Sequence, residues 1–264
     1  MNVFIALVSH NHSELINDIN VLSGLLDTFK IVVKSNTSND DFSKFNEHDN
    51  FHWLNSNYGK GFGSNNNYIF NYCINELDAV ADDIFIVLNP DVIVDKNSIL
   101  SLIKHMIQDG VSLSAINLFK DSNYQIFDNS IRKYPRLIDL TLSLVTGKNK
   151  TLLDKSNIIS PIDIEWAAGS FLCFKIGHYK ALSGFDESYF MYCEDIDICF
   201  RSNEMGCKVR YYPFIKAIHL AQHANRRIFS KHFFWHLSSA IRFIAKKNGL
   251  INGVVSSLIG VDHG

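Results

Sequence analysis

The sequence is poor in several features that would assign it to common protein classes. It has four prolines and fourteen glycines in 264 residues, a composition that excludes collagen-like and low-complexity chains. Its five cysteines are odd in number and include no CxxC pair, so neither a disulfide framework nor a cysteine-rich zinc site is indicated. Such a cysteine content fits a reducing compartment best, and we expect a cytoplasmic protein.

Long apolar runs are also missing. The run Val3–Val8 has no basic segment before it and ends at polar Ser9, so no secretory signal is indicated. Runs such as Ile84–Leu88 are far shorter than the roughly 20 residues that cross a bilayer. Any role at a membrane is therefore expected to be peripheral.

The net charge is −2, but the charged residues are unevenly distributed along the chain. Residues 206–250 hold nine Lys and Arg and no acid, whereas residues 1–205 hold sixteen basic and twenty-six acidic residues. Apolar residues make up 47% of the chain, which excludes disorder as a description of the whole. We expect one main domain at 1–220, with halves at about 1–115 and 116–220, followed by a basic, aromatic segment at 221–264.

Strand-like and helix-like stretches alternate in the first half of the chain. The expected strands are Val3–Val8, Phe29–Val33 and Ile84–Leu88, and the expected helices are 13–26, 65–81 and 98–108. Ser13 and Ser98 are the expected helix caps. This alternation predicts an α/β fold with a mostly parallel central sheet and helices on both faces. A further short helix is expected at 137–145.

Polar residues follow each of these strands, as Ser9-His10-Asn11, Ser35-Asn36 and Asn89-Pro90-Asp91. Ligands of such sheets bind outside the carboxyl ends of the strands, so the three segments are expected to meet at one crevice. They could also be simple turns. A glycine-rich loop at 57–66 would let backbone approach a ligand closely, although it lacks the pattern of a phosphate-binding loop.

Glu194, Asp195 and Asp197 form a carboxylate cluster after an aromatic segment. Crowding and desolvation would raise their pKa values and prepare a general base. Alternatively, the three acids begin a helix whose dipole lowers their pKa values, with Arg201 as an ion-pair partner. The local pattern does not decide between these. Asp91 follows an expected buried strand and a proline, and His219 ends a strand-like run; each could ligate a cation or merely belong to a turn or a strand end.

Six motifs occur in order along roughly residues 1–220: Val8-Ser9-His10-Asn11, Asn57-Tyr58-Gly59 with Asn65 or Asn66, Leu88-Asn89-Pro90-Asp91-Val92, Trp166–Phe174 with Gly184-Phe185-Asp186-Glu187, Phe190–Arg201, and Gly206 with Pro213 and His219. In this order they resemble the motifs of inverting family 2 glycosyltransferases with the GT-A fold. The resemblance is greatest to the bacterial rhamnosyltransferases of O-antigen, lipopolysaccharide and cell-wall assembly.

The resemblance implies a role for each motif. Asp195 would be the general base, supported by Glu194, and Asp91 and His219 would hold Mg²⁺ or Mn²⁺. The donor would be bound by Ser9, Asn11, Asn36, Asn57, Gly59, Asn89 and Asp91, and the acceptor by Trp166, Gly169, Asp186, Glu187 and Arg201. The implied donor is dTDP-L-rhamnose, and the implied acceptor is a sugar, N-acetylglucosamine above all, on undecaprenyl or another polyprenyl diphosphate.

Two positions depart from the family pattern. Ser35 stands where the family has a nucleoside-contacting Asp, and Asn89 replaces the first acid of the usual D-x-D metal motif. Recognition of the base could therefore differ, and metal binding would depend on Asp91, His219 and the phosphates. Other nucleotide-sugar donors, a non-catalytic nucleotide-sugar-binding protein and a nucleotidyltransferase remain as alternatives. The paired acids at 194–195 argue against a binding-only protein.

The C-terminal segment combines basic and aromatic residues on a helical pattern. It could pack on its own domain, or it could lie on the anionic cytoplasmic face of the inner membrane, near a lipid-linked acceptor. The candidate membrane residues are Arg226, Arg227, Lys231, Phe233, Phe234, Trp235, Arg242, Lys246 and Lys247. Nucleic acid is not expected as a partner, because the rest of the chain is acidic and carries no nucleic-acid motif.

Overall fold

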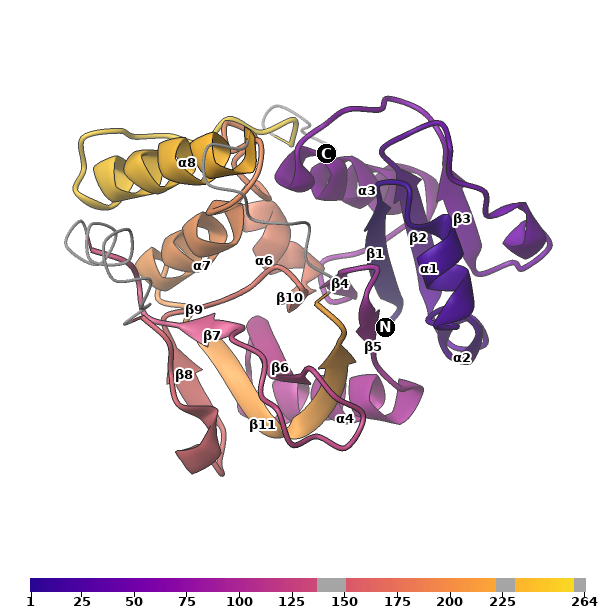
Figure 1. The fold of residues 1–264 in the computed structure, drawn as a ribbon, viewed down its shortest axis with the longest axis horizontal. Coiled ribbons are helices and arrows are strands. Elements are labelled where there is room, and N and C mark those ends of the chain that lie inside the picture. The colour runs from indigo at the N-terminus through magenta and orange to yellow at the C-terminus, as the bar shows by residue number, and fades with distance from the viewer. Residues whose placement is uncertain (137–150, 222–230, 259–264) are drawn as a thin grey trace.

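The structure is a computed structural model that describes residues 1–136, 151–221 and 231–258 (Figure 1). Its strands are β1 Val3–Ser9, β2 Lys30–Ser35, β3 Phe51–Leu54, β4 Ile84–Leu88, β5 Val92–Ile93, β6 Leu113–Phe119, β7 Ile131–Arg132, β8 Ile162–Ile164, β9 Trp166–Ala167, β10 Phe171–Lys175 and β11 Val209–His219. Its helices are α1 Ser13–Asp18, α2 Ser23–Leu26, α3 Phe62–Glu76, α4 Lys96–Asp109, α6 Ile176–Ala181, α7 Glu194–Glu204 and α8 Lys231–Lys247.

Nine of these strands form one sheet with the order β3-β2-β1-β4-β10-β6-β11-β5, and β8 pairs with β11. Strands β1 to β4 pair in parallel, while β10 runs antiparallel between β4 and β6. Strands β7 and β9 form a separate small ribbon. The predicted α/β class with a mostly parallel sheet is confirmed.

Side chains from alternate positions of the central strands enter two hydrophobic clusters. Phe4 and Ala6 of β1 belong to the cluster that includes Ile69 of α3. Ile5 and Leu7 belong to the other, which includes Leu102 of α4. Both faces of the sheet are therefore covered, which is why the strands read as continuous apolar runs rather than as alternating ones.

Several helix ends differ from the sequence expectation. The single helix expected at 13–26 is two helices, α1 and α2, because Asn20 between them adopts a left-handed backbone with φ of 53°. Ser13 is the first residue of α1 and not its cap, because His12 occupies the N-cap position. Helix α4 is capped by Asp95, whose carboxylate accepts the Ser98 N–H at 3.0 Å, so Ser98 is the capped residue and not the cap. The helix expected at 137–145 lies outside the described residues.

The polar strand ends do meet at one edge of the sheet. The Asn36 N–H donates to the Ser9 carbonyl at 2.7 Å, which joins the ends of β2 and β1. The Asn89 N–H donates to the Ser170 carbonyl at 3.0 Å, so the segment after β4 contacts the start of β10. At the far side, His219 of β11 pairs with Val92 of β5. This register places His219 next to the segment that carries Asp91.

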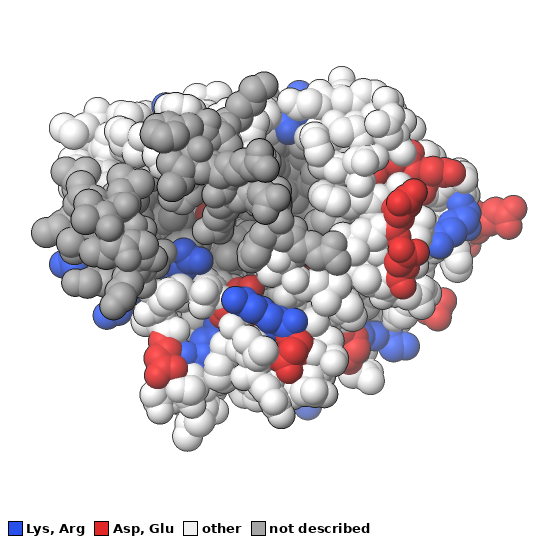
Figure 2. Space-filling model, viewed as in Figure 1, with Lys and Arg blue, Asp and Glu red and all other residues white. Residues whose placement is uncertain are grey.

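Helix α8 packs against its own domain, over α7 (Figure 1). Lys246 forms ion pairs of 2.8 Å with both Asp186 and Asp197, and its side chain is only 8% exposed. The basic C-terminal segment thus contacts the acidic part of the chain directly in the folded protein, although the two are separate in the sequence. On the face shown in Figure 2, acidic and basic side chains lie close to one another over the lower part of the molecule. No helix in the described ranges is long and apolar enough to cross a membrane.

Candidate active site

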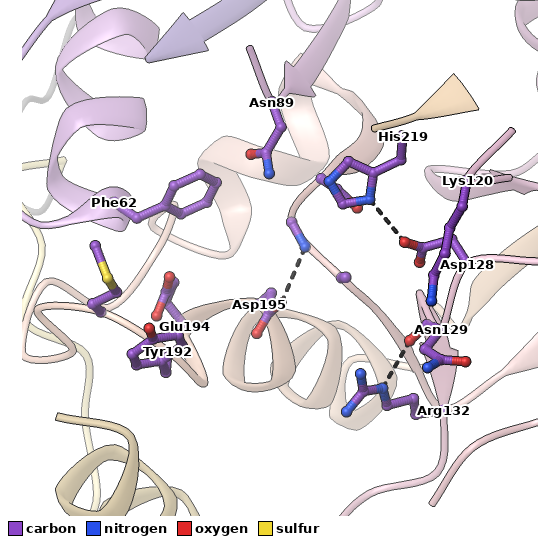
Figure 3. Close-up of a pocket in the computed structure, with 14 residues that line it drawn as sticks. Phe62, Asn89, Lys120, Asp128, Asn129, Arg132, Tyr192, Glu194, Asp195 and His219 are labelled. Atoms are coloured by element: carbon purple, nitrogen blue, oxygen red, sulfur yellow. Dashed lines mark hydrogen bonds and ion pairs between the residues drawn. The ribbon is translucent and has the colours of Figure 1, made fainter. Parts of the chain in front are cut away.

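A cavity of about 700 Å³ opens where β4, β6, β7, β11 and α7 converge (Figure 3). Its lining includes Asn89 and His219 from the edge of the sheet, and Glu194 and Asp195 from the start of α7. Lys120 and Arg132 also line it. Side chains that are more than one hundred residues apart in sequence thus share one solvent-accessible space.

Asp195 is held at the cavity by backbone donors. Its Oδ2 accepts the Gly169 N–H at 3.0 Å, and its Oδ1 accepts the Ile196 N–H at 2.9 Å. A Cβ added at Gly169 would lie 3.0 Å from the nearest atom of the Phe62 ring, so glycine permits this close approach. The carboxylate is fixed in position before any ligand binds.

Burial decides the ionisation of the two acids that begin α7. It raises the pKa of Asp195, although the Gly169 and Ile196 donors oppose the rise. Burial, together with the Asp195 charge, raises the pKa of Glu194 well above its ordinary value. Both acids lie in the first helical turn, yet desolvation outweighs the helix dipole. Asp195 is therefore a stronger base than an exposed aspartate, as general-base chemistry near neutral pH requires.

The third acid of the cluster has a different place. Asp197 is fully buried, accepts a hydrogen bond from Arg201 at 2.7 Å and forms an ion pair of 2.8 Å with Lys246. Arg201 also donates to the carbonyls of Leu182 and Gly184. These contacts tie α7 to the neighbouring loop, and Asp197 and Arg201 are structural.

The loop that leads into α7 is strained. Tyr192 and Cys193 both have left-handed backbones, with φ of 72° and 65°. Such conformations are uncommon outside glycine and cluster at functional sites. The Tyr192 hydroxyl hydrogen-bonds His232 of α8 at 3.0 Å, and the Met191 carbonyl accepts from Ser239 at 3.0 Å. Helix α8 thus supports the loop that positions the two acids.

Asp91, His219 and Asp128 form a chain of contacts at the edge of the sheet. His219 Nε2 lies 3.4 Å from Asp91 Oδ1, and His219 Nδ1 lies 2.9 Å from Asp128 Oδ2. Burial alone would lower the pKa of His219, but the hydrogen bonds and charges of Asp128 and Asp91 raise it to about 9. A histidine oriented by a carboxylate behind it is a frequent arrangement of metal ligands.

The predicted donor residues form the strand-end edge of the sheet, but several side chains are engaged internally. The Asn36 amide donates to the Lys60 carbonyl and accepts the Lys60 N–H, both at 2.9 Å. The Ser9 hydroxyl is buried and donates to Asp40 at 2.7 Å. These two residues therefore shape the site rather than line it. Asn11, Asn57 and Gly59 all have left-handed backbones in exposed loops there, and Asn89 lines the cavity.

Ser35, at the position of the missing family Asp, is fully buried and accepts the Trp53 indole N–H at 2.9 Å. It is therefore not available to a ligand. Buried Asp40 lies nearby under the end of β1, and one of its oxygens has no hydrogen-bond partner among the described residues. An acid is thus present at this edge, although not at position 35.

The predicted acceptor residues divide into two groups. Gly169 lines the cavity, and Trp166 lies beneath it, with its ring 5.5 Å from the Arg132 guanidinium. Asp186 and Glu187 are elsewhere: Asp186 is buried against Lys246 and the Val255 N–H, and Glu187 accepts from Ser257. An acceptor role for Asp186, Glu187 and Arg201 is not supported, because the three anchor the C-terminal segment or α7.

One of the predicted membrane residues, Lys246, needs correction, and the others stay a prediction. Lys246 is buried in the ion network and cannot face a membrane, and the ammonium of Lys247 lies 5.4 Å over the Tyr134 ring. The Trp235 ring packs against Phe190 at an angle of 49°, and the Arg242 guanidinium lies over Tyr189. Phe234 is 55% exposed, and Phe233 is half-buried. Arg226 and Arg227 lie outside the described residues, and Lys231 begins α8.

Sequence reasoning gave no role to several cavity residues, among them Lys120 and Asp128. Asp128 lies in the loop after β6, 91 residues from the histidine that it contacts. The sequence around Arg132 suggests only an exposed loop, yet this residue lines the cavity as well. Cations and acids in such loops carry no periodic signal, so only the fold brings them to the site.

The fold is that of the GT-A glycosyltransferases. The structure matches GalNAc-T7 solved with UDP, GalNAc and Mn²⁺, with a TM-score of 0.58 and 12% identity over 93% of this chain and 48% of that one. It also matches TarS of S. aureus in complex with UDP-GlcNAc, with a TM-score of 0.56 and 12% identity over 94% of this chain and 66% of that one. At this identity the likeness concerns the fold alone. No family model matches the chain.

Sequence relatives are more specific than the fold. The chain is 36% identical to rhamnosyltransferase WbbL of Escherichia coli K12, over 99% of both chains. It is 29% identical to the N-acetylglucosaminyl-diphospho-decaprenol L-rhamnosyltransferase of Mycobacterium tuberculosis, over 63% of this chain and 56% of that one. The protein belongs to the rhamnosyltransferase family that includes WbbL.

Proposed function

We propose that the protein transfers L-rhamnose from dTDP-L-rhamnose to N-acetylglucosamine carried on undecaprenyl diphosphate, with inversion, in O-antigen assembly. The observation that carries the proposal is the buried Asp195 carboxylate, held by Gly169 in a cavity that His219 also lines. The names of the E. coli and mycobacterial relatives support rhamnose as the sugar. The mycobacterial name also supports a polyprenyl-diphosphate acceptor.

Asp195 would remove the proton from the acceptor hydroxyl. The hydroxyl oxygen then bonds to the anomeric carbon of the donor, while the bond from that carbon to the diphosphate oxygen breaks. Attack from the face opposite the diphosphate inverts the configuration, and no covalent enzyme intermediate is needed. Because burial raises the pKa of Asp195, transfer should slow as the pH falls through that value. Burial and the Asp195 charge raise the pKa of the neighbouring Glu194, which favours its neutral form beside the base.

The residues at the sheet edge fit a divalent cation, Mg²⁺ or Mn²⁺. Asp91 and His219 present an oxygen and a nitrogen 3.4 Å apart, a separation that one cation can bridge, and Asp128 orients the histidine. No group of three or more His, Cys, Asp or Glu that could hold a metal occurs in the described part of the chain, so phosphate and water would complete the ligand set. A bound cation would neutralise charge on the leaving diphosphate.

A peripheral place on the cytoplasmic face of the inner membrane fits the exposed side of α8. Phe234 and Ile241, seven residues apart on this helix, are 55% and 54% exposed, and Leu250 beyond it is 79% exposed. Apolar side chains at this spacing lie on one face of a helix and can enter a membrane surface. The opposite side of α8 carries Phe243 and Lys246, which are buried against the domain.

The proposal is tested by incubating the protein with a panel of nucleotide sugars and N-acetylglucosamine linked to a polyprenyl diphosphate. Product mass identifies the sugar transferred. We expect a product heavier by one deoxyhexose, formed with dTDP-L-rhamnose and dependent on Mg²⁺ or Mn²⁺. Transfer only from another donor would contradict the assigned sugar, and transfer undiminished by metal chelation would contradict the metal.

A further inference from the structure

We infer that Lys120 and Arg132 form a subsite for the diphosphate of the lipid-linked acceptor, in the cavity that Asp195 also lines. This inference rests on the proposed function, because it assigns a place to one part of that acceptor. Neither residue belongs to any of the six motifs of the sequence. Both line the same cavity as the proposed base.

The two cations come from a single wall of the cavity. Lys120 directly follows β6 and Arg132 is the last residue of β7, and Figure 3 shows them on either side of Asn129, across the cavity from Phe62. Asp195 lies between this wall and Phe62. The acid of this wall, Asp128, is already hydrogen-bonded to His219 at 2.9 Å. The charge of Lys120 also acts on Asp128, and the two cationic side chains line the same cavity as the base.

Arg132 is oriented by contacts within the protein. Its Nε donates to the Asn129 carbonyl at 2.8 Å, and its guanidinium lies 5.5 Å over the Trp166 ring. Trp166 is itself fixed, since its indole N–H donates to the Lys133 carbonyl at 2.9 Å. A planar guanidinium held in this way can bind two phosphate oxygens at once, and a nearby lysine adds a mobile point charge.

The position of the base distinguishes acceptor from donor. The donor edge is built from the ends of β1, β2 and β4, with His219 at the end of β11, whereas Lys120 follows β6 and Arg132 ends β7. Asp195 must touch the acceptor hydroxyl, and the acceptor diphosphate is attached to the same sugar ring. The acceptor diphosphate would therefore lie one ring away from the base, in the cavity that these two cations line.

The test compares two acceptors that share the sugar: N-acetylglucosamine on octyl diphosphate and the neutral octyl N-acetylglucosaminide. Lys120→Gln is the primary variant, because the Arg132 charge also acts on the pKa of Asp195. Arg132→Lys tests the bidentate contact. Lys133→Gln, an exposed residue outside the cavity lining, is the control that removes the same charge. Melting temperatures of all variants establish that they fold.

We expect Lys120→Gln to lower the preference for the diphosphate acceptor, measured as the ratio of the two kcat/KM values, by roughly tenfold or more. Lys133→Gln should leave the ratio at the wild-type value. An unchanged ratio in Lys120→Gln would overturn the inference. So would a raised KM for the donor with the acceptor ratio intact, since the cations would then serve the donor diphosphate.

A binding measurement separates this inference from the proposed transfer reaction. Octyl diphosphate is titrated calorimetrically into the metal-free protein without donor, with octyl glucoside as the neutral probe. Binding of octyl diphosphate that is weakened by Lys120→Gln supports the subsite even if no rhamnose is transferred. Equal binding to wild type and Lys120→Gln rejects the subsite even if the rhamnose reaction is confirmed.

Discussion

Replacing Lys246 should lower the stability of the fold, because this residue forms ion pairs with two buried carboxylates. Its ammonium lies 2.8 Å from both Asp186 Oδ2 and Asp197 Oδ1, and both carboxylates are fully buried. Lys246→Met keeps most of the aliphatic volume and removes only the charge. In this variant Asp186 keeps its hydrogen bonds from Ser188 and the Val255 N–H, and Asp197 keeps its ion pair with Arg201. Both carboxylates lose their ion pair with α8.

The size of the effect follows from burial. Removing one partner of a buried ion pair costs about 3–5 kcal/mol, because the remaining charges stay desolvated without compensation. For a chain of this size, 1 kcal/mol lowers the melting temperature by about 2–4 °C, so a drop on the order of 10 °C is expected. Lys247→Met is the matched control. It removes a cation over the Tyr134 ring and should cost no more than about 1 kcal/mol.

The pH dependence gives the sharper assay. Burial would raise the pKa of Asp186, but hydrogen bonds from Lys246 and Ser188 lower it, so its stabilising contribution in the wild type is present at neutral pH and lost only in acid. Without Lys246, burial dominates and raises the pKa of the Asp186 carboxyl. The free energy of unfolding of Lys246→Met, measured by denaturant titration, should fall further below the wild type at pH 8 than at pH 5. A loss no larger than that of Lys247→Met, or one equal at both pH values, would refute the reasoning.

Three further predictions concern the metal pair, the donor loop and the tail. In metal-free protein, protonated His219 stabilises the fold below pH 6.5 and the stabilisation is lost as pH rises through about 9, so the melting-temperature advantage over His219→Asn should shrink across this range. Gly61→Ala should cost about 1–3 kcal/mol in thermal denaturation, because its Cβ would overlap the Phe190 carbonyl, whereas Gly24→Ala meets no atom within 4 Å and should be tolerated. Phe234→Ser with Ile241→Ser should weaken sedimentation with anionic vesicles at an unchanged melting temperature, and undiminished sedimentation would count against the membrane face.

The fold could be predicted from sequence where local pattern and tertiary environment agree. Strand β4 has the predicted bounds, Ile84–Leu88, because a run of buried apolar residues suits a strand covered on both faces. Helix ends were less predictable. Asn20 ends a helix through its left-handed backbone, and Asp95 begins one as its N-cap. Other polar residues nearby in the sequence could have taken either role, so the pattern does not fix the helix ends.

The site could be predicted only where its chemistry is concentrated in a short stretch. Glu194 and Asp195 are adjacent in sequence and lie together at the cavity, but the sequence did not decide whether burial or the helix dipole sets their pKa values. The partnership of His219 with Asp128 depends on β6 and β11 being neighbours in the sheet. The amphipathic pattern of the tail likewise indicated a helix, yet not that Lys246 would be buried by Asp186.

The most direct test of the account is the rate of rhamnose transfer by Asp195→Asn. The amide can still accept the Gly169 N–H, so the melting temperature and the affinity for dTDP-L-rhamnose should stay close to the wild type. It cannot take a proton, and we predict that the transfer rate under saturating donor and acceptor falls by about 10²–10⁴-fold. A folded, donor-binding Asp195→Asn protein with near-normal turnover would contradict the assignment of Asp195 as the base.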